Sequence, residues 1–309
     1  MPTTQQPLRG IALKVASVCV FVSMASLIKA SADAIPPGQA VFFRSFFAIP
    51  VILAWLMIQH DLAHGLETNN PMGHVWRGLV GTSAMGLGFA GLGLLPLPEV
   101  TAIGYAAPIL VVVFAAMFLN EQVRLFRLSM VALGMGGVLI VLSPRLNLDP
   151  TTADTGEALG AVLVLMGAVC AALAQVFVRK LVQTERTAAI VFWFSVTASA
   201  LSLLTIPWGW VWPTPAQWAL LIGAGLAGGV GQILLTSSYR FADASLIAPF
   251  EYTSMLLAIG VGYFIFAETP TTTMLLGAAL IVTAGIAIIW RERQLGLQRG
   301  ARKAGTPQP

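Results

Sequence analysis

The chain has 309 residues, of which 57% are hydrophobic and only 10% are charged, well below the roughly 25% charge of an ordinary soluble domain. A soluble fold of this size cannot bury that much apolar surface. The composition therefore excludes a soluble globular protein and predicts an integral membrane protein. The net charge of +4 fits basic loops beside membrane spans, so we expect a lipid bilayer as partner and no nucleic acid.

A spanning helix needs about 20 mostly apolar residues, so the chain has room for about ten spans and for no separate soluble domain. Apolar runs separated by Pro, Gly and Asn predict ten helices. No segment shows the sustained alternation that predicts strands. In chain order the predicted helices cover residues 11–29, 38–58, 72–94, 98–118, 126–142, 157–181, 187–207, 216–238, 243–266 and 271–290.

The sequence repeats within itself. Residues 10–30 resemble 160–180 at an offset of 150, and residues 98–121 resemble 245–268 at an offset of 147. The second offset also places Gly81 opposite Gly228 in the glycine-rich third and eighth runs. Each copy thus holds five predicted spans.

Because five is odd, the second copy must enter the membrane from the opposite side. The predicted fold class is therefore all-α integral membrane, with ten transmembrane helices arranged as two inverted five-helix repeats. The repeats cover residues 8–144 and 157–291, and residues 292–309 form a basic cytoplasmic tail that we expect to be disordered. Inverted repeats are typical of secondary transporters, whose solute site lies between the halves near the midplane.

The basic residues indicate an orientation. Fourteen of the 17 Lys and Arg residues lie toward the side that bears both termini, whereas Lys29 and Arg145 lie on the other side and Arg44 lies within the second span. Cytoplasmic loops carry an excess of basic residues. We therefore expect both termini in the cytoplasm of a bacterial cell, with the protein in the inner membrane.

Two ionisable residues lie inside predicted spans, where charge is costly and usually functional. Arg44 lies about 9 Å into the second helix from the outer side, and Glu251 lies about 12 Å into the ninth from the inner side, at 1.5 Å per residue. We expect the two side chains to approach each other. They either snorkel or form a static ion pair, or they line a cavity and bind polar groups of a solute, with Glu251 also able to carry a coupling proton.

Further candidates lie at helix ends and at depth. Glu99 is in the first turn of its helix, where a carboxylate either complements the helix dipole or contacts the solute. Glu121 and Glu268 follow the fourth and ninth helices, where they can cap the next helix or form a gate contact. Polar and aromatic residues predicted to line a solute pocket are Tyr105, Gln175, Trp193, Gln232 and Tyr252. We expect no bound metal and no cofactor.

Short motifs occur in a fixed order along both halves. They are Val41–Phe47, Leu97–Ala102 followed by Ala107-Pro108, Asn120-Glu121, Ala248–Tyr252 and Ala267-Glu268. This pattern resembles the EamA family of the drug/metabolite transporter superfamily over about residues 8–291. The resemblance implies secondary transport of small organic solutes by alternating access, and the chain looks similar to bacterial members that take up riboflavin or S-adenosylmethionine.

We therefore expect an inner-membrane uptake transporter, not an enzyme, with riboflavin as the first small-molecule solute to test. Arg44 and Glu251 are expected to hold its polar groups, and Tyr105, Trp193 and Tyr252 to stack on it. One alternative is an exporter of amino acids or other metabolites. Another is an integral membrane enzyme that acts on lipid. A homodimer is a further assembly to consider.

Overall fold

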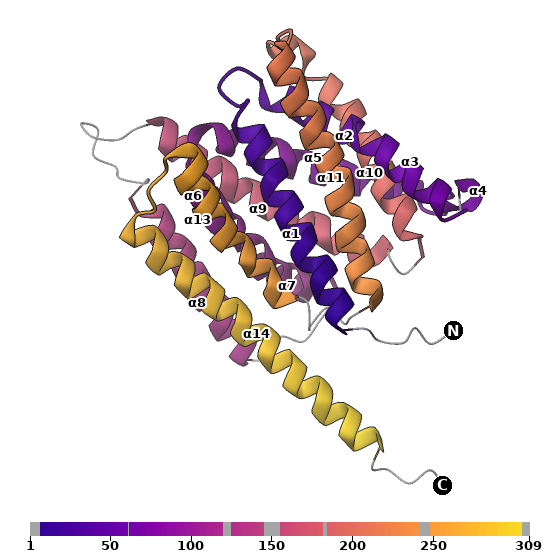
Figure 1. Cartoon of the computed structure of the whole chain (residues 1–309). Coiled ribbons are helices and arrows are strands. Elements are labelled where there is room, and N and C mark those ends of the chain that lie inside the picture. Colours follow the sequence, from indigo (N-terminus) through magenta and orange to yellow (C-terminus); the bar gives the residue numbers. More distant parts are fainter. Residues whose placement is uncertain are drawn as a thin grey trace.

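The computed structural model describes residues 7–60, 62–119, 125–144, 155–181, 184–241 and 248–304. Within these ranges every regular element is helical, as the composition predicts. Figure 1 shows the helices packed side by side in one bundle. Helix α1 begins, and α14 ends, at the same end of this bundle, which we call the near end; the opposite end is the far end.

The helices agree closely with the predicted spans. In the first half they are α1 (Pro7–Lys29), α2 (Pro37–Phe46), α3 (Ala48–Ile58), α4 (Leu62–Gly65), α5 (Pro71–Leu94), α6 (Leu97–Gly104), α7 (Ala106–Leu119) and α8 (Leu125–Leu142). In the second half they are α9 (Thr155–Leu181), α10 (Thr187–Leu203), the 3-10 turn η1 (Ile206–Trp208), α11 (Pro215–Phe241), the 3-10 turn η2 (Ala248–Tyr252), α13 (Thr253–Phe266) and α14 (Thr272–Ala304).

Five helices in the described residues are long and apolar enough to cross a membrane. They cover Leu8–Lys29, Pro37–Ile58, Gly156–Val178, Pro215–Leu235 and Thr272–Arg291. Shorter apolar helices cover Leu97–Val111, Leu128–Leu142, Ala188–Leu203 and Phe250–Phe266. Helix α5 has sufficient length, but its glycines, His74 and Arg77 lower its hydropathy. The protein is thus a multi-pass membrane protein.

Two predicted spans are interrupted rather than continuous. The predicted helix 38–58 breaks at Phe47, and the predicted helix 98–118 breaks at Tyr105. A proline stands three residues after each break, Pro50 and Pro108, and proline has no N–H to bond the carbonyl four residues before it. The chain therefore restarts its helix instead of continuing it.

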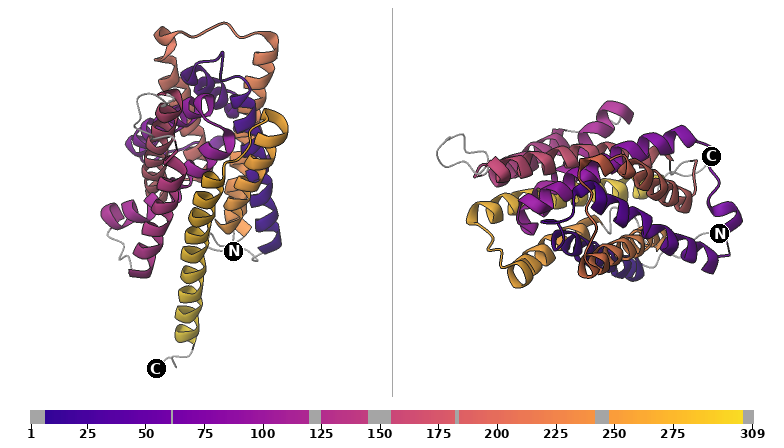
Figure 2. Two further views of the ribbon diagram at one scale, coloured as in Figure 1. Left: turned by 90° about the vertical axis from the view of Figure 1, so that its left-hand side faces the viewer. Right: turned by 90° about the horizontal axis from the view of Figure 1, so that it is seen from above.

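The end of the chain also differs from the expectation. We expected residues from 292 onward to be irregular, but α14 continues to Ala304. This segment is rich in Arg, Gln, Leu and Ala, which are good helix formers, and a helix already begun propagates easily. Figure 2 shows α14 extending beyond the other helices at the near end.

Small residues allow the long helices to pack closely. Helix α1 packs along α11, α5 along α9 and α8 along α14. Between α8 and α14 the contact involves backbone atoms, because a Cβ on Gly277 would lie 2.6 Å from the carbonyl oxygen of Gly137. Glycine at such positions lets two helices approach without a side chain between them.

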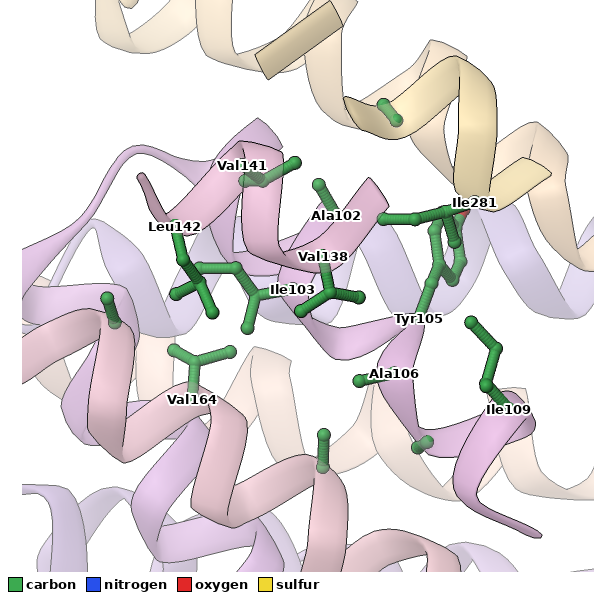
Figure 3. Packing of buried hydrophobic residues seen from close by; sticks show 14 of the residues in the cluster. Ala102, Ile103, Tyr105, Ala106, Ile109, Val138, Val141, Leu142, Val164 and Ile281 are labelled. Atoms are coloured by element: carbon green, nitrogen blue, oxygen red, sulfur yellow. The ribbon is translucent and has the colours of Figure 1, made fainter. Parts of the chain in front are cut away.

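A buried apolar cluster surrounds the break between α6 and α7 (Figure 3). The break residues themselves are inside it, since Tyr105 is 6% exposed and Ala106 is fully buried. The cluster also includes Val138 and Val141 of α8 and Ile281 of α14. The interrupted segment is therefore fixed by packing against several helices.

The outside of the bundle is apolar. Large side chains such as Leu256 (72% exposed), Phe264 (83%) and Ile265 (68%) point away from the protein. Trp208 and Trp212 are exposed beside the start of α11, as expected for aromatic residues that anchor a protein at the membrane interface. A surface of this kind requires lipid around it.

We expect Gly137→Ala to destabilise the protein by about 1–3 kcal/mol, because the added methyl group would lie 2.7 Å from the carbonyl oxygen of Gly277. The neighbouring Gly136→Ala is the matched control, since a Cβ there meets nothing within 4 Å. Thermal unfolding of both variants in detergent checks this. An equal midpoint for the two variants would contradict the close contact of α8 with α14.

Candidate functional site

An ion pair joins four helices at the far end of the bundle. The Nζ of Lys29, the last residue of α1, lies 2.9 Å from Oε1 of Glu268, which follows α13. Lys29 also donates hydrogen bonds to the backbone carbonyls of Leu92 (3.2 Å) and Leu95 (2.8 Å) at the end of α5. Glu268 Oε2 accepts a hydrogen bond of 2.9 Å from the N–H of Leu97. We call Lys29 and Glu268 the far-end clamp.

The expected capping role of Glu268 needs correction. Glu268 does accept the free N–H that begins a helix, but that helix is α6 and not α14, which follows it in the chain. The reason is the turn after α13, where Ala267 adopts the left-handed conformation (φ 54°) and the N–H of Glu268 bonds back to Gly262. Its repeat counterpart Glu121 lies outside the described residues.

A second ion pair lies inside the bundle, toward the near end. Lys14 of α1 is 1% exposed and pairs with Glu251 of η2, which is 51% exposed. Beside it, the hydroxyl of Tyr105 bonds Ser254 Oγ and the carbonyl oxygen of Glu251. The ring of Tyr105 lies 5.2 Å from the ring of Tyr252, at 66°. We call these five residues the tyrosine junction.

The tyrosine junction joins two positions that the repeat makes equivalent. Tyr105 and Tyr252 are 147 residues apart, which is the offset of the second repeated segment. Tyr105 stands at the break between α6 and α7, and Tyr252 ends η2 just before α13. The irregular points of the two halves therefore meet each other, and their side chains fill the space between them.

Two arginines with buried guanidinium nitrogens converge on one aromatic ring. Arg44 of α2 (7% exposed) and Arg77 of α5 place their Cζ atoms 5.8 and 3.9 Å from the ring centroid of Phe194 in α10. These are distances for cation–π contacts. Neither arginine makes a hydrogen bond or an ion pair to another side chain of the described residues. We call Arg44 and Arg77 the arginine pair.

The expectation that Arg44 and Glu251 approach each other is not met in this structure, because each belongs to a different cluster. Glu251 has Lys14 as its partner, whereas Arg44 lies on Phe194. The charge count had assigned Lys14 and Arg77 to the cytoplasmic edge, but both lie inside the bundle. Arg77 stands five residues inside the predicted span 72–94, and this position indicates that it lies within the bundle.

The remaining candidates are dispersed. Trp193 donates its indole N–H to the carbonyl oxygen of Leu66 at 3.0 Å, so it lies by the loop before α5; its neighbour Phe194 meets the arginine pair instead. Gln175 is exposed on α9, and Gln232 is half-buried on α11, one turn after Gly228. Glu99 is buried in the first turn of α6, where its charge complements the helix dipole.

At the near end, Glu185 ties the loop before α10 to the start of α5. Its Oε1 accepts hydrogen bonds of 2.8 Å from the N–H groups of Asn69 and Asn70, and its Oε2 lies 3.6 Å from His74 Nε2. Burial raises the pKa of Glu185, but the hydrogen bonds to its charged form outweigh burial, so the net pKa lies below its ordinary value. The carboxylate is therefore charged at neutral pH.

A pocket of about 240 Å³ lies at the far end between α1, α2 and α5. Apolar side chains line it, including Ile28, Ala40 and Phe89. It lies beside the far-end clamp, since Ile28 precedes Lys29 in α1. None of the charged candidates lines this pocket.

Comparison with known proteins gives a consistent result. The model of the EamA-like transporter family matches residues 8–143 and 158–291. An S-adenosylmethionine uptake transporter of Rickettsia bellii is 28% identical over 92% of this chain and 97% of its own length. The pseudopaline exporter CntI of Pseudomonas aeruginosa is 29% identical over 90% and 95%.

A riboflavin transporter of Rhizobium johnstonii is 29% identical over 84% of this chain and 83% of its own length. One protein of known crystal structure superposes with a TM-score of 0.64, at 20% identity, over 93% of this chain and 98% of that chain. This likeness shows a shared fold.

We expect Glu251→Gln to destabilise the protein more than Lys14→Met does. The first change leaves a fully buried ammonium group without its partner, which costs about 3 kcal/mol, whereas the second removes the buried charge and leaves a half-exposed carboxylate. Thermal midpoints in detergent provide the comparison. The double variant should recover most of the lost thermal stability. If Lys14→Met lowers the midpoint more than Glu251→Gln does, Lys14 is not the buried member of the pair.

Proposed function

Because the chain belongs to the EamA-like transporter family, we propose that it is a secondary transporter of the bacterial inner membrane that moves a small organic solute by alternating access. One observation carries the proposal. Two ion pairs within the described residues, Lys14 with Glu251 and Lys29 with Glu268, each join the first half to the second, and so does the contact of Glu185 with His74. Charges are thus concentrated where a solute path between two halves would run.

The arrangement as two inverted five-helix repeats with ten spans is part of the proposal. The family model matches once in each half. The packing of the helices follows the repeat. In the repeat, α1 corresponds to α9 and α5 corresponds to α11. In the bundle, α1 packs along α11 and α5 packs along α9, so each helix packs on the counterpart of the other. A twofold relation between the halves would produce this pairing. The excess of basic residues toward the side that bears both termini supports a cytoplasmic near end as part of this proposal.

Alternating access requires the two ends of the bundle to open in turn. At the far end, opening requires separation of Lys29 from Glu268, because these residues hold α1 and the end of α13 together. At the near end, opening requires Glu185 to release Asn69 and Asn70. Both contacts are polar, so water can replace the protein partners of these groups when an end opens.

We propose that the solute meets Arg44 and the tyrosine junction on its path. Arg44, Glu251 and the two tyrosines offer a cation, a half-exposed carboxylate and aromatic rings within the bundle. Gln175 and Trp193 lie away from these groups, so we leave them out of the proposed path. Riboflavin and S-adenosylmethionine are the first uptake substrates to test, because relatives that move them match this chain over most of its length.

Export is the second candidate. The relative named as a pseudopaline exporter is as similar to this chain as the relatives named for uptake. A secondary transporter can run in either direction, depending on the solute gradient and on any coupled ion. The direction must therefore be measured with solute supplied on each side of the membrane.

If the protein is an uptake transporter, we expect cells that express it to accumulate one of the two substrates with saturable kinetics. If it is an exporter, we expect everted membrane vesicles to accumulate the substrate instead. Arg44→Ala and Glu251→Gln should each lower transport at least tenfold, because each removes a charged group from the proposed path. Initial rates are measured with immunoblots of membrane fractions as the control for protein level. Unchanged rates in both variants would remove these residues from the path.

The far-end clamp predicts a charge-reversal result. Lys29→Glu and Glu268→Lys should each lower transport about tenfold, because like charges then face each other at the seam. The double variant should regain transport, since it restores an opposite pair. Asp33→Lys, an exposed change at the same end, is the control. If the double variant transports no faster than either single variant, this pair has no direct role in transport.

A further inference from the structure

The buried polar atoms without partners are concentrated on two helices. Apart from atoms of His74 and Glu185, every buried side-chain nitrogen or oxygen without a hydrogen bond in the described residues belongs to Arg44 and Ser45 of α2 or to Arg77 and Thr82 of α5. Buried polar groups in native proteins are almost always paired. Unpaired donors gathered in one region indicate a partner that the chain itself does not supply.

The arginines account for most of these atoms. Nε of Arg44 and both Nε and Nη1 of Arg77 are buried without a partner. A buried guanidinium group without an anion is among the most costly arrangements in a protein. Here two are close enough to repel each other, and both lie on the single ring of Phe194. The ring interacts with their positive charge but cannot accept their several N–H groups.

The chain gives these guanidinium groups space. A Cβ on Gly81 would overlap Nη1 of Arg77 and lie 2.9 Å from Cε2 of Phe194. A Cβ on Gly228 of α11 would lie 3.1 Å from Nε of Arg44. Gly81 and Gly228 are the two glycines that the 147-residue offset aligns. Equivalent positions in both halves therefore admit one arginine each.

Three carboxylates of the described residues that lie between the two halves have partners other than the arginines. Glu251 pairs with Lys14, Glu268 with Lys29, and Glu185 with the loop before α5. No ion pair of the described residues includes Arg44 or Arg77. The two positive charges thus lie between elements of both halves, α2 and α5 on one side and α10 and α11 on the other.

We propose that Arg44, Arg77 and Phe194 form a binding site for the oxyanion group of the transported solute, a carboxylate or a phosphate. This inference rests on the proposed transport function. A guanidinium group binds two oxygens of such an anion at once. The anion neutralises the two like charges, and Phe194 contacts the carbon atoms attached to it. A solute with an anionic group beside a flat apolar part fits this site.

Three probes with the same ring test the proposal: benzoate, phenyl phosphate and the neutral benzamide. The purified full chain in detergent is titrated with each at constant ionic strength, and the thermal midpoint is followed by tryptophan fluorescence. We expect at least one anion to raise the midpoint while benzamide leaves it unchanged. The anion that acts identifies a carboxylate or a phosphate site. If neither anion raises the thermal midpoint more than benzamide does, the proposal is wrong.

Variants locate the effect. Arg44→Gln and Arg77→Gln should weaken the apparent affinity for the active anion at least tenfold, because each loses charged hydrogen bonds. Arg9→Gln is the matched control, since Arg9 also lies on an aromatic ring, Phe241 at 4.2 Å, but is exposed at the start of α1. An equal loss in Arg9→Gln, or unchanged affinity in both site variants, overturns the assignment.

Arg44→Lys and Arg77→Lys keep the positive charge, and these variants replace the glutamine variants in the titration if the latter do not fold. They should bind the anion more weakly than the unaltered chain, because lysine lacks the planar fork of donors. Anion binding that depends on both arginines without transport of any tested solute would reject the transport proposal alone. Transport that persists in both site variants, without anion binding, would reject this inference alone.

Discussion

The cost of burying charge in an apolar bundle dominates this structure. A chain with 10% charged residues has few charges to place, and those that lie inside must find partners or have a function. Lys14, Lys29 and the arginine pair all lie where the first half meets the second. The seam between the halves is therefore polar at several levels, while the outer surface stays apolar toward lipid. When such a seam opens, water can take the place of the lost hydrogen-bond partners.

Interrupted helices position the groups at that seam. Pro50 and Pro108 each remove one backbone hydrogen bond, and the helix breaks just before them, at Phe47 and Tyr105. At Tyr105 the break turns an aromatic hydroxyl toward η2, where it meets Ser254 and the backbone of Glu251. In membranes, irregular backbone is tolerated only inside protein or beside a cavity. The buried cluster around Tyr105 and Ala106, to which both halves contribute residues, satisfies this requirement.

Much of the fold was predictable because membrane helices have a local signal. About 20 apolar residues between turn residues define a span, so α5 and α8 were predicted within one residue of their ends. The helix breaks were not predicted, although Pro50 and Pro108 were visible, because proline within a span produces either a kink or an interruption according to its neighbours. The helical course of residues 292–304 was missed for a related reason: charge indicates exposure to water and not irregular structure.

The sequence by itself determined the class of protein, the places of the helices and the repeat with its 147-residue offset, because hydrophobic length and internal similarity are properties of the chain alone. Only the tertiary structure decided which charges meet. Lys14 and Glu251 are 237 residues apart, and nothing local makes Glu251 prefer Lys14 to Arg44. Likewise, only the packed bundle places Arg77 beside Arg44 on Phe194. Side-chain partners in a helical bundle depend on how helices that are distant in sequence rotate and pack against one another.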